Sequence, residues 1–209
     1  MSVSLEGVVK RFDGRAAVDG VSAELSSGEF FVVLGPSGCG KSTLLRLIAG
    51  LETLDGGRIA LDGETVAGPG RHLAPEARRV GVVFQSYALW PHMTVAGNIA
   101  FGIEAAGTDR RAAEREARDH LRAVSLEDFA ERAPAALSGG QRQRVALARC
   151  LASRARTVLM DEPLANLDPH LRAAMETELA AFHRRSGATT LYITHDQREA
   201  MALGDRVAV

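Results

Sequence analysis

A glycine-rich segment between a hydrophobic run and a helical run constrains the fold of this chain more than any other feature. Residues 35–43 read GPSGCGKST, directly after FFVVL and leading into STLLRLIAG. This matches the pattern G-x-x-x-x-G-K-[ST] in its required strand-to-helix context, where glycines let backbone N–H groups surround a phosphate and the helix dipole adds positive charge. We therefore predict a site for a nucleoside triphosphate, although a glycine-rich turn with a solvated lysine also matches so short a pattern.

Every residue of this loop is a candidate contact, with Lys41 reaching the β- and γ-phosphates and Ser42 holding magnesium. The residues are Gly35, Pro36, Ser37, Gly38, Cys39, Gly40, Lys41, Ser42 and Thr43.

Short runs rich in β-branched residues alternate with helical stretches, which predicts an α/β fold with a mainly parallel sheet, the core of a P-loop NTPase. The first thirty residues instead predict an antiparallel β layer, because short strands there are joined by Asp-Gly and Ser-Gly turns. A wholly helical pattern indicates a helical subdomain, at about 90–150, inserted into a single unit of residues 1–209. The strand candidates are 30–34, 79–84, 157–160 and 189–194, and the helix candidates are 42–49, 109–124, 141–152 and 169–185.

Composition excludes several classes of protein. The 209 residues are 46% hydrophobic and 24% charged, with a formal net charge of -1, so we expect no general binding of nucleic acid. Two cysteines provide no disulfide framework. The sequence has no signal-peptide pattern and no uninterrupted apolar run of about 18 residues, so we expect neither secretion nor a membrane span.

Two adjacent acids follow the predicted strand in TVLMDEP. In P-loop enzymes an aspartate at this strand end belongs to the magnesium shell, which assigns Asp161. Glu162 can turn into the same pocket and deprotonate the attacking water, although two acids can also simply cap a strand at the surface. Asp168 is expected to cap the helix that begins at Pro169, which explains it without any function. His195, at the end of another strand, can donate to a γ-phosphate, but a lone histidine is more often structural.

The segment LSGGQ, residues 137–141, places a serine and two glycines immediately before a helix. This is a second helix start suited to an anion. Because the chain already has one phosphate loop, the second site needs another nucleotide, and a second copy of the chain is its simplest supplier. We therefore expect a homodimer.

The motifs together resemble the nucleotide-binding subunit of ABC transporters over nearly the whole chain. GPSGCGKST, Gln85, LSGGQ, VLMDEP, NLD and a histidine in ITHD occur in the order found in that family. The resemblance implies ATP and Mg²⁺ as ligands, with two ATP molecules held head to tail between two copies. It implies that Phe12 stacks on adenine, although a strand aromatic can simply pack in the β layer. It also implies that Gln85 meets magnesium and the attacking water.

The resemblance assigns the remaining roles as well. Glu162 corresponds to the general base, His195 to a γ-phosphate contact, and Asp168 to an aspartate that crosses the dimer interface. The LSGGQ residues would contact the nucleotide of the other copy, with Ser138 and Gly140 at its γ-phosphate. These residues are Ser138, Gly139, Gly140 and Gln141.

The stretch QSYALWPHMTVAGNIAFGI is similar to importer cassettes for sugars, polyamines, iron and phosphonates. It implies two membrane-spanning permease subunits as partners, a solute-binding protein acting through them, and a peripheral location on the cytoplasmic face of the inner membrane. Trp90 and Met93 are then either a docking patch or part of the helical core. Departures from the importer pattern occur at Ala96, Gly97 and Ala165.

Importers of this group commonly continue into a regulatory domain rich in strands, which we expect to be absent from this sequence. Two other functions stay open at this point: a soluble ABC ATPase acting on ribosomes or DNA, and an exporter cassette. A single cassette without a coiled-coil insert argues against the former, and the lack of a fused membrane domain argues against the latter.

Overall fold

The computed structural model describes residues 1–165 and 167–209. Contacts divide these residues into two compact units. The first unit consists of Met1–Val82, Arg156–Glu162 and Glu176–Val209, and the second consists of Val83–Ala155 and Pro163–Met175. Within the described ranges, none of the helices combines the length and the hydrophobicity that crossing a membrane requires.

The first unit contains a five-stranded antiparallel sheet in the order β2-β1-β4-β5-β6. The antiparallel layer expected near the N-terminus is confirmed, because β1 and β2 form a hairpin in which Phe12 pairs with Arg15. The later strands of this sheet, which follow α1, were not predicted from the sequence. The strands are β1 (Val3–Phe12), β2 (Arg15–Leu25), β4 (Gly56–Leu61), β5 (Glu64–Gly68) and β6 (Arg71–His72).

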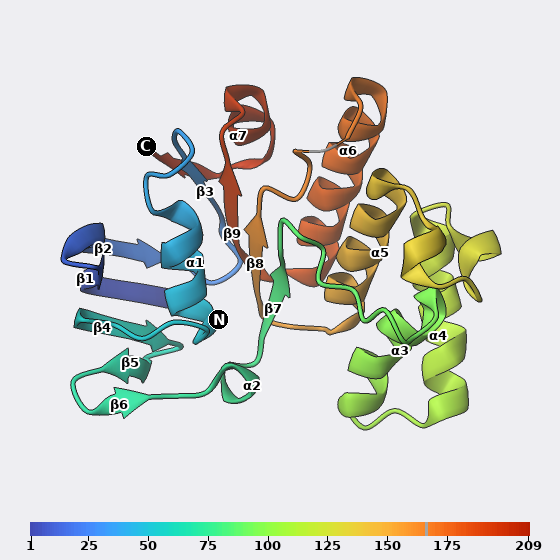
Figure 1. The fold of residues 1–209 in the computed structure, drawn as a ribbon, viewed down its shortest axis with the longest axis horizontal. Coiled ribbons are helices and arrows are strands. Elements are labelled where there is room, and N and C mark those ends of the chain that lie inside the picture. Colours follow the sequence, from blue (N-terminus) through green and yellow to red (C-terminus); the bar gives the residue numbers. More distant parts are fainter. Residues whose placement is uncertain (166) are drawn as a thin grey trace. The chain divides into compact units, whose positions relative to one another are not determined.

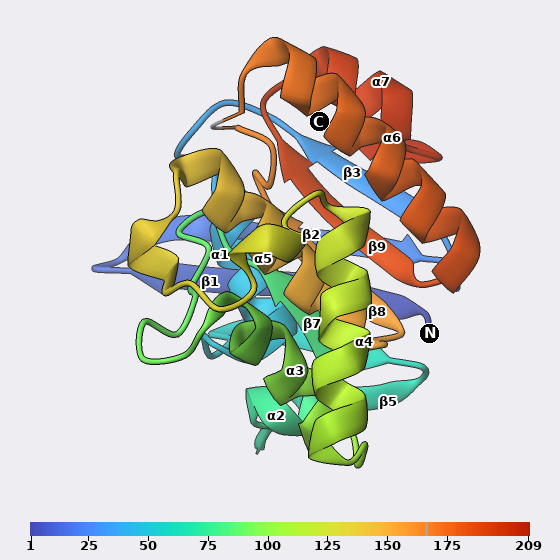
Figure 2. The same cartoon turned by 90° about the vertical axis from the view of Figure 1, so that its right-hand side faces the viewer.

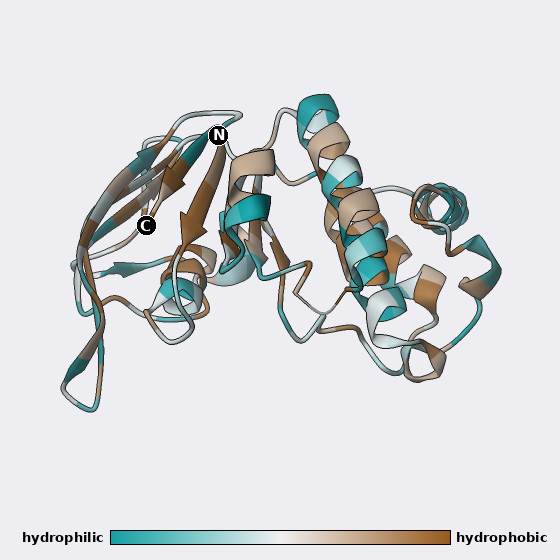
Figure 3. Ribbon diagram, turned by 90° about the horizontal axis from the view of Figure 1, so that it is seen from above, coloured by the Kyte–Doolittle hydropathy of each residue, from teal (hydrophilic) through white to brown (hydrophobic). Residues whose placement is uncertain are grey.

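A second sheet, in the order β10-β3-β9-β8-β7, is parallel between β10 and β3, β3 and β9, and β8 and β9. Every residue of β8 and β9 is buried, and Figure 3 shows hydrophobic residues concentrated on strands while helices alternate in hydropathy. The carboxyl ends of parallel strands meet at one edge, so the segments that follow β3, β8 and β9 converge. The strands are β3 (Phe30–Leu34), β7 (Val80–Val83), β8 (Thr157–Asp161), β9 (Thr189–Thr194) and β10 (Arg206–Ala208).

Helix α1 (Lys41–Ala49) packs its leucine-rich face into a core that both sheets of the first unit share. It ends at Gly50, whose φ of 81° and backbone bonds to the last turn terminate the helix. The buried Arg78, which ends the short α2 (Pro75–Arg78), donates to the carbonyl oxygens of Leu47 at 2.7 Å and Ile48 at 2.9 Å. The C-terminal end of α1 is therefore capped by a cation.

Two more helices belong wholly or partly to the first unit. Helix α7 (Gln197–Leu203) follows β9, and α6 (Pro169–Ser186) begins in the second unit and ends in the first. The first helical residue of α6 is Pro169, and Asp168 Oδ1 accepts from the N–H of Leu171 at 3.0 Å. The predicted helix cap is thereby confirmed.

The second unit is helical. Residues such as Ile99, Leu121 and Val145 form its core. Ala113, Ala117 and Leu121 are the buried residues of α4, and the rest of that helix is mainly charged, as the sequence spacing predicts. Figure 2 shows α4 in full view. The elements are α3 (Val95–Ala105), α4 (Arg110–Ala123), α5 (Gly139–Ala152) and the short 3₁₀ turns η1 (Glu127–Phe129) and η2 (Pro134–Ala136).

Candidate functional site

The loop between β3 and α1 turns its backbone sharply at the carboxyl edge of the parallel sheet. Gly38 and Gly40 have φ angles of 83° and 94°, which residues with a Cβ atom rarely adopt. A Cβ atom at Gly40 would lie 2.0 Å from the carbonyl oxygen of Ala17, so β2 packs closely against the loop. Among the described residues, no side chain caps the N-terminus of α1. The first-turn N–H groups therefore suit an anion.

Lys41 is the first residue of α1 and is 7% exposed. Its Nζ donates to the carbonyl oxygens of Gly35 at 2.8 Å and Pro36 at 2.7 Å, and it lies 3.7 Å from Cys39 Sγ. The loop's own carbonyl groups thus hold the ammonium group beside the uncapped helix end. A phosphate group in this loop would meet both the N–H groups and a cation.

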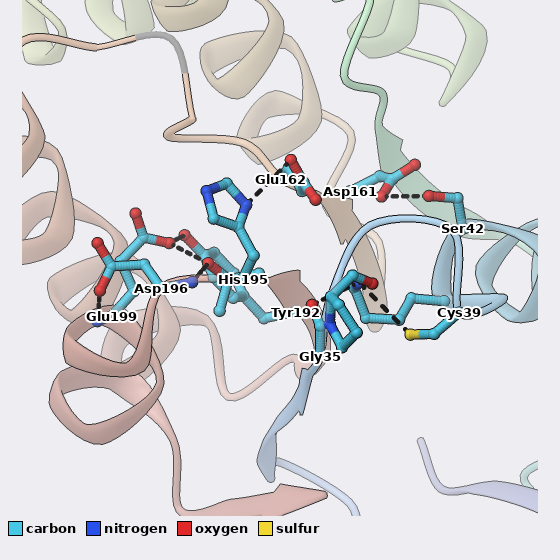
Figure 4. A network of polar contacts seen from close by, with 12 residues as sticks. Gly35, Cys39, Ser42, Asp161, Glu162, Tyr192, His195, Asp196 and Glu199 are labelled. Carbon is cyan, nitrogen blue, oxygen red and sulfur yellow. Dashed lines mark hydrogen bonds and ion pairs between the residues drawn. The ribbon is translucent and has the colours of Figure 1, made fainter. Parts of the chain in front are cut away.

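Ser42 and Asp161 bring two oxygen donors together. Ser42 Oγ donates to Asp161 Oδ1 at 2.9 Å, joining the start of α1 to the end of β8 (Figure 4). Burial raises the pKa of Asp161, the neighbouring charge of Glu162 adds to this rise, and the Ser42 hydrogen bond opposes it. A buried carboxylate beside a hydroxyl is a donor set that suits Mg²⁺, so these residues fit the predicted metal.

Glu162 turns away from Asp161 and faces His195. Its φ of 46° lies in the left-handed region, a conformation that costs a residue with a side chain about 1–3 kcal/mol and that clusters at functional sites. The N–H of Glu162 donates to the carbonyl oxygen of Ile193 at 3.0 Å. Its Oε2 lies 3.3 Å from His195 Nδ1, which follows β9 (Figure 4). The side chains of Glu162 and His195 are 15% and 54% exposed, so the pair lies at the solvent boundary.

LSGGQ lies in the second unit, at the start of α5. Ser138 is the N-cap, accepting from Gln141 N, and Gln141 Oε1 accepts from Ser138 N at 2.8 Å, which completes a capping box. Gln141 therefore has a structural role that the sequence analysis did not assign. A Cβ atom at Gly139 would meet nothing within 4 Å, whereas one at Gly140 would lie 3.2 Å from Leu167 Cδ2. The helix start is thus capped by its own residues and carries little side-chain bulk.

Three other candidates lie outside these clusters. Phe12 ends β1 with 46% of its surface exposed, and Lys10 Nζ lies 5.2 Å from the centroid of its ring. Gln85 is exposed in the turn after β7, in the second unit, and Asp168 is exposed at the start of α6. Their predicted contacts with nucleotide, metal or a second copy stay predictions. Asn166, in the NLD motif, lies outside the described residues.

The sequence pattern of the ABC transporter family matches residues 18–165, which include the phosphate loop, LSGGQ, the strand β8 and both acids at its end. The chain belongs to the ABC transporter family. This ABC cassette also resembles, with a TM-score of 0.88 and 30% sequence identity, the dimeric structure of the bacterial ABC transporter cassette MJ0796, over 98% of this chain and 92% of that one. The expected P-loop NTPase fold is confirmed.

Among curated relatives, the cassette is 52% identical over 207 residues to the sn-glycerol-3-phosphate import ATP-binding protein UgpC 1 of Rhizobium johnstonii. It is 51% identical over 213 residues to the spermidine/putrescine import ATP-binding protein PotA of Pseudomonas fluorescens. These alignments cover 99% and 100% of this chain but 55% and 58% of the relatives. The cassette therefore spans somewhat more than half the length of these two proteins.

Sequence reasoning missed a buried polar network next to the site. Glu199 of α7 is 3% exposed, and its Oε2 accepts hydrogen bonds from Tyr192 Oη and Thr194 Oγ1, both at 2.8 Å. The signal available in the sequence was a glutamate on the buried face of a short helix, directly after a strand that ends in threonine. A buried carboxylate is costly without such donors.

Proposed function

We propose that this cassette binds ATP together with Mg²⁺, hydrolyses it, and thereby powers import through membrane-spanning subunits. The observation that carries the proposal is the convergence of Lys41, the Ser42–Asp161 pair and the Glu162–His195 pair at one edge of the parallel sheet. A cation, a metal-type donor pair and a carboxylate–imidazole pair are the groups that phosphoryl transfer needs.

Binding of ATP rests on the loop and on α1. The N–H groups at the uncapped helix start and the Lys41 ammonium would hold the β- and γ-phosphates. Ser42 and Asp161 would hold Mg²⁺, and Gln85 is the further candidate ligand that the family resemblance supplies. When bound, this ion neutralises charge on the phosphate oxygens. The Phe12 ring, half exposed at the end of the hairpin, is the candidate surface for adenine.

Glu162 and His195 would have separate roles in hydrolysis. The Glu162 carboxylate would accept a proton from a water molecule as the water oxygen attacks the γ-phosphorus. The bond between that phosphorus and the bridging oxygen of ADP then breaks, giving ADP and phosphate. His195, 3.3 Å from Glu162 Oε2, would orient the carboxylate and donate to a γ-phosphate oxygen.

A second copy would complete each site. The capping box of α5 uses the N–H groups of Ser138 and Gln141 and leaves those of Gly139 and Gly140 for an anion. The phosphate loop of the same chain would already hold the phosphates of one nucleotide, so this second place needs another. The similar cassette MJ0796 has a dimeric structure, which supports pairing of two copies. The family resemblance supplies the head-to-tail arrangement, in which Asp168 would cross the interface. ATP would then close the dimer and hydrolysis would release it.

The relatives support import as the process that is driven. UgpC 1 and PotA are named as import ATP-binding proteins. We infer that two permease subunits, served by a solute-binding protein, hold the cassette at the cytoplasmic face of the inner membrane.

The test is Glu162→Gln, which removes the base but keeps the size of the side chain. We expect ATP binding to persist, hydrolysis to fall by about 100-fold or more, and a dimer to accumulate with ATP and Mg²⁺ in analytical ultracentrifugation. The matched control is Glu64→Gln, which changes an exposed carboxylate on β5. Rapid turnover by Glu162→Gln would contradict the assignment of the base.

A second measurement tests the shared site. If both copies contribute to each site, the rate of phosphate release per chain should rise with protein concentration and level off when the dimer is saturated. A rate per chain that is independent of concentration, in a sample that sediments as a monomer, would mean that one chain suffices.

A further inference from the structure

The turn that carries His195 is held by a hydrogen-bonded chain that joins the buried Thr194 and Glu199 to the half-buried Asp196. Thr194 ends β9 and is 2% exposed, and Asp196 is the N-cap of α7, so His195 lies between two fixed points. Thr194 Oγ1 accepts from the N–H of Asp196 at 3.0 Å. Asp196 Oδ1 in turn accepts from the N–H groups of Arg198 at 2.7 Å and Glu199 at 3.4 Å. Both backbone neighbours of the histidine are thereby held; Figure 4 labels His195, Asp196 and Glu199 of this network.

The direction of this chain follows from the chemistry of its groups. The Thr194 hydroxyl has one proton and two lone pairs. Because an N–H group can only donate, the hydroxyl must accept from Asp196, and its own proton goes to Glu199 Oε2 at 2.8 Å. Tyr192 Oη donates to the same oxygen at 2.8 Å. The Glu199 carboxylate thus orients the Thr194 hydroxyl for its contact with the turn.

This arrangement differs from an ordinary capping box, in which the glutamate at the third helical position accepts directly from the N–H of the N-cap residue. Glu199 occupies that third position in α7. Here the Thr194 hydroxyl stands between the glutamate and the N-cap N–H. The cap of α7 is consequently tied to the last residue of β9, and the residue between them is held in register with the sheet.

We propose that Thr194 and Glu199 are positioning residues that aim the His195 ring at Glu162. The proposal rests on the function proposed above, in which His195 acts in hydrolysis. The ring is 54% exposed, so packing alone does not fix it, whereas its backbone is fixed on both sides. A shift of about 1 Å in a reacting group can cost about 100-fold in rate, and the 3.3 Å contact between His195 and Glu162 tolerates little movement.

The decisive variant is Thr194→Val, which keeps the shape of the side chain and removes the hydroxyl. We expect kcat for ATP to fall by about 10- to 100-fold. The affinity for ADP should be unchanged, because the phosphate loop is not altered and ADP has no γ-phosphate for His195 to contact. Thr194→Ser keeps the hydroxyl and should recover most of the lost rate. An equal loss of kcat in the serine variant would overturn the proposal.

Thr190→Val is the matched control. Thr190 is a buried threonine of the same strand, 1% exposed, and its hydroxyl contacts His183 Nδ1 at 3.2 Å and the carbonyl oxygen of Ala188 at 3.4 Å. The Thr190→Val variant should unfold at a lower urea concentration than the wild type, with kcat unchanged. If Thr190→Val and Thr194→Val reduce kcat equally, the effect is general destabilisation and the proposal is overturned.

His195→Ala separates this inference from the function on which it rests. If His195→Ala leaves kcat unchanged, the proposed role of the histidine fails. If it lowers kcat while Thr194→Val matches the wild type, only the positioning role is overturned. Where both lower kcat, the double variant should be no slower than His195→Ala alone, because the threonine acts through the ring. Additive losses would contradict the proposal.

A spectroscopic measurement reports on the ring itself, even where turnover is too slow to measure. The side-chain resonances of His195 in isotope-labelled protein, assigned by their loss in His195→Ala, should shift in Glu162→Gln and also in Thr194→Val. They should stay in place in Thr190→Val. Unchanged His195 resonances in Thr194→Val would overturn the proposal.

Discussion

Gly40→Ala tests whether the β1–β2 hairpin packs against the phosphate loop as the structure describes. Gly40 has a φ of 94°, and the left-handed region costs an alanine about 1–2 kcal/mol. The new Cβ atom would also lie 2.0 Å from the carbonyl oxygen of Ala17, below the 3.0 Å that real contacts respect. The strand and the loop must separate by about 1 Å, and overpacking of this kind costs about 1–3 kcal/mol.

The two contributions give an expected loss of about 2–5 kcal/mol in the free energy of unfolding. Gly38→Ala is the matched control, because Gly38 has a φ of 83° but a Cβ atom there would meet nothing within 4 Å. That variant should lose only the conformational part, about 1–2 kcal/mol. Equilibrium unfolding in urea, in EDTA and without nucleotide, measures both losses under conditions in which ligand binding does not contribute.

The test is the difference between the free energies of unfolding that the two variants lose. If Gly40→Ala loses no more stability than Gly38→Ala, Ala17 does not lie against the loop. The hairpin that carries Phe12 would then not be placed beside the phosphate site, and the candidate adenine surface would lose its support.

Three further predictions concern the site. Lys41→Ala should weaken ATP binding by about 10- to 100-fold in an equilibrium titration, since a hydrogen bond to a charged group contributes about 1.5–3 kcal/mol; unchanged affinity would contradict the phosphate cradle. A maleimide at pH 8 should label the exposed Cys39, with protection by ATP, and spare the buried Cys150, whose pKa burial raises to about 12; mass spectrometry that finds Cys150 labelled in folded protein would refute this. Because burial raises the pKa of Asp161, its charge destabilises the metal-free fold above that pKa, and the cost disappears as pH falls towards the unfolded value. In EDTA, Asp161→Asn should therefore be more stable to urea than the wild type at pH 8, by a margin that narrows as pH falls towards 3.8, the ordinary pKa of an aspartate, and a less stable variant at pH 8 would contradict this sign.

The phosphate loop, the two acids and the parallel strands follow from local patterns in the sequence. The strands β3 and β9 were predicted with the bounds that the structure has, because continuous runs of β-branched and aromatic residues are typical of strands buried on both faces. The direction in which the Glu162 side chain points could not be predicted from the motif TVLMDEP, because its turn towards His195 depends on a φ of 46°.

Features that depend on distant partners were not predictable in the same way. The strand β4 pairs with β1, from a part of the chain about fifty residues away, and its glycines hide the alternation that would mark it. The Thr194–Glu199 contact depends on the geometry of a turn rather than on a motif. Trp90 was expected as docking patch or core, and it is half-buried, with its ring 4.7 Å from that of the exposed Phe101 and beneath the guanidinium group of Arg149.

Helix α1 is terminated by the chain at only one of its ends. Gly50 and the Arg78 guanidinium close its C-terminus, whereas a glycine stands where a serine or aspartate would normally close its N-terminus. A bound phosphate would take the place of that missing residue, so the ligand completes the secondary structure of the protein. Any substitution that supplied the cap from within would put an oxygen where the phosphate binds. At this helix end, stability in the absence of ligand and affinity for ligand are therefore competing demands on a single position in the sequence.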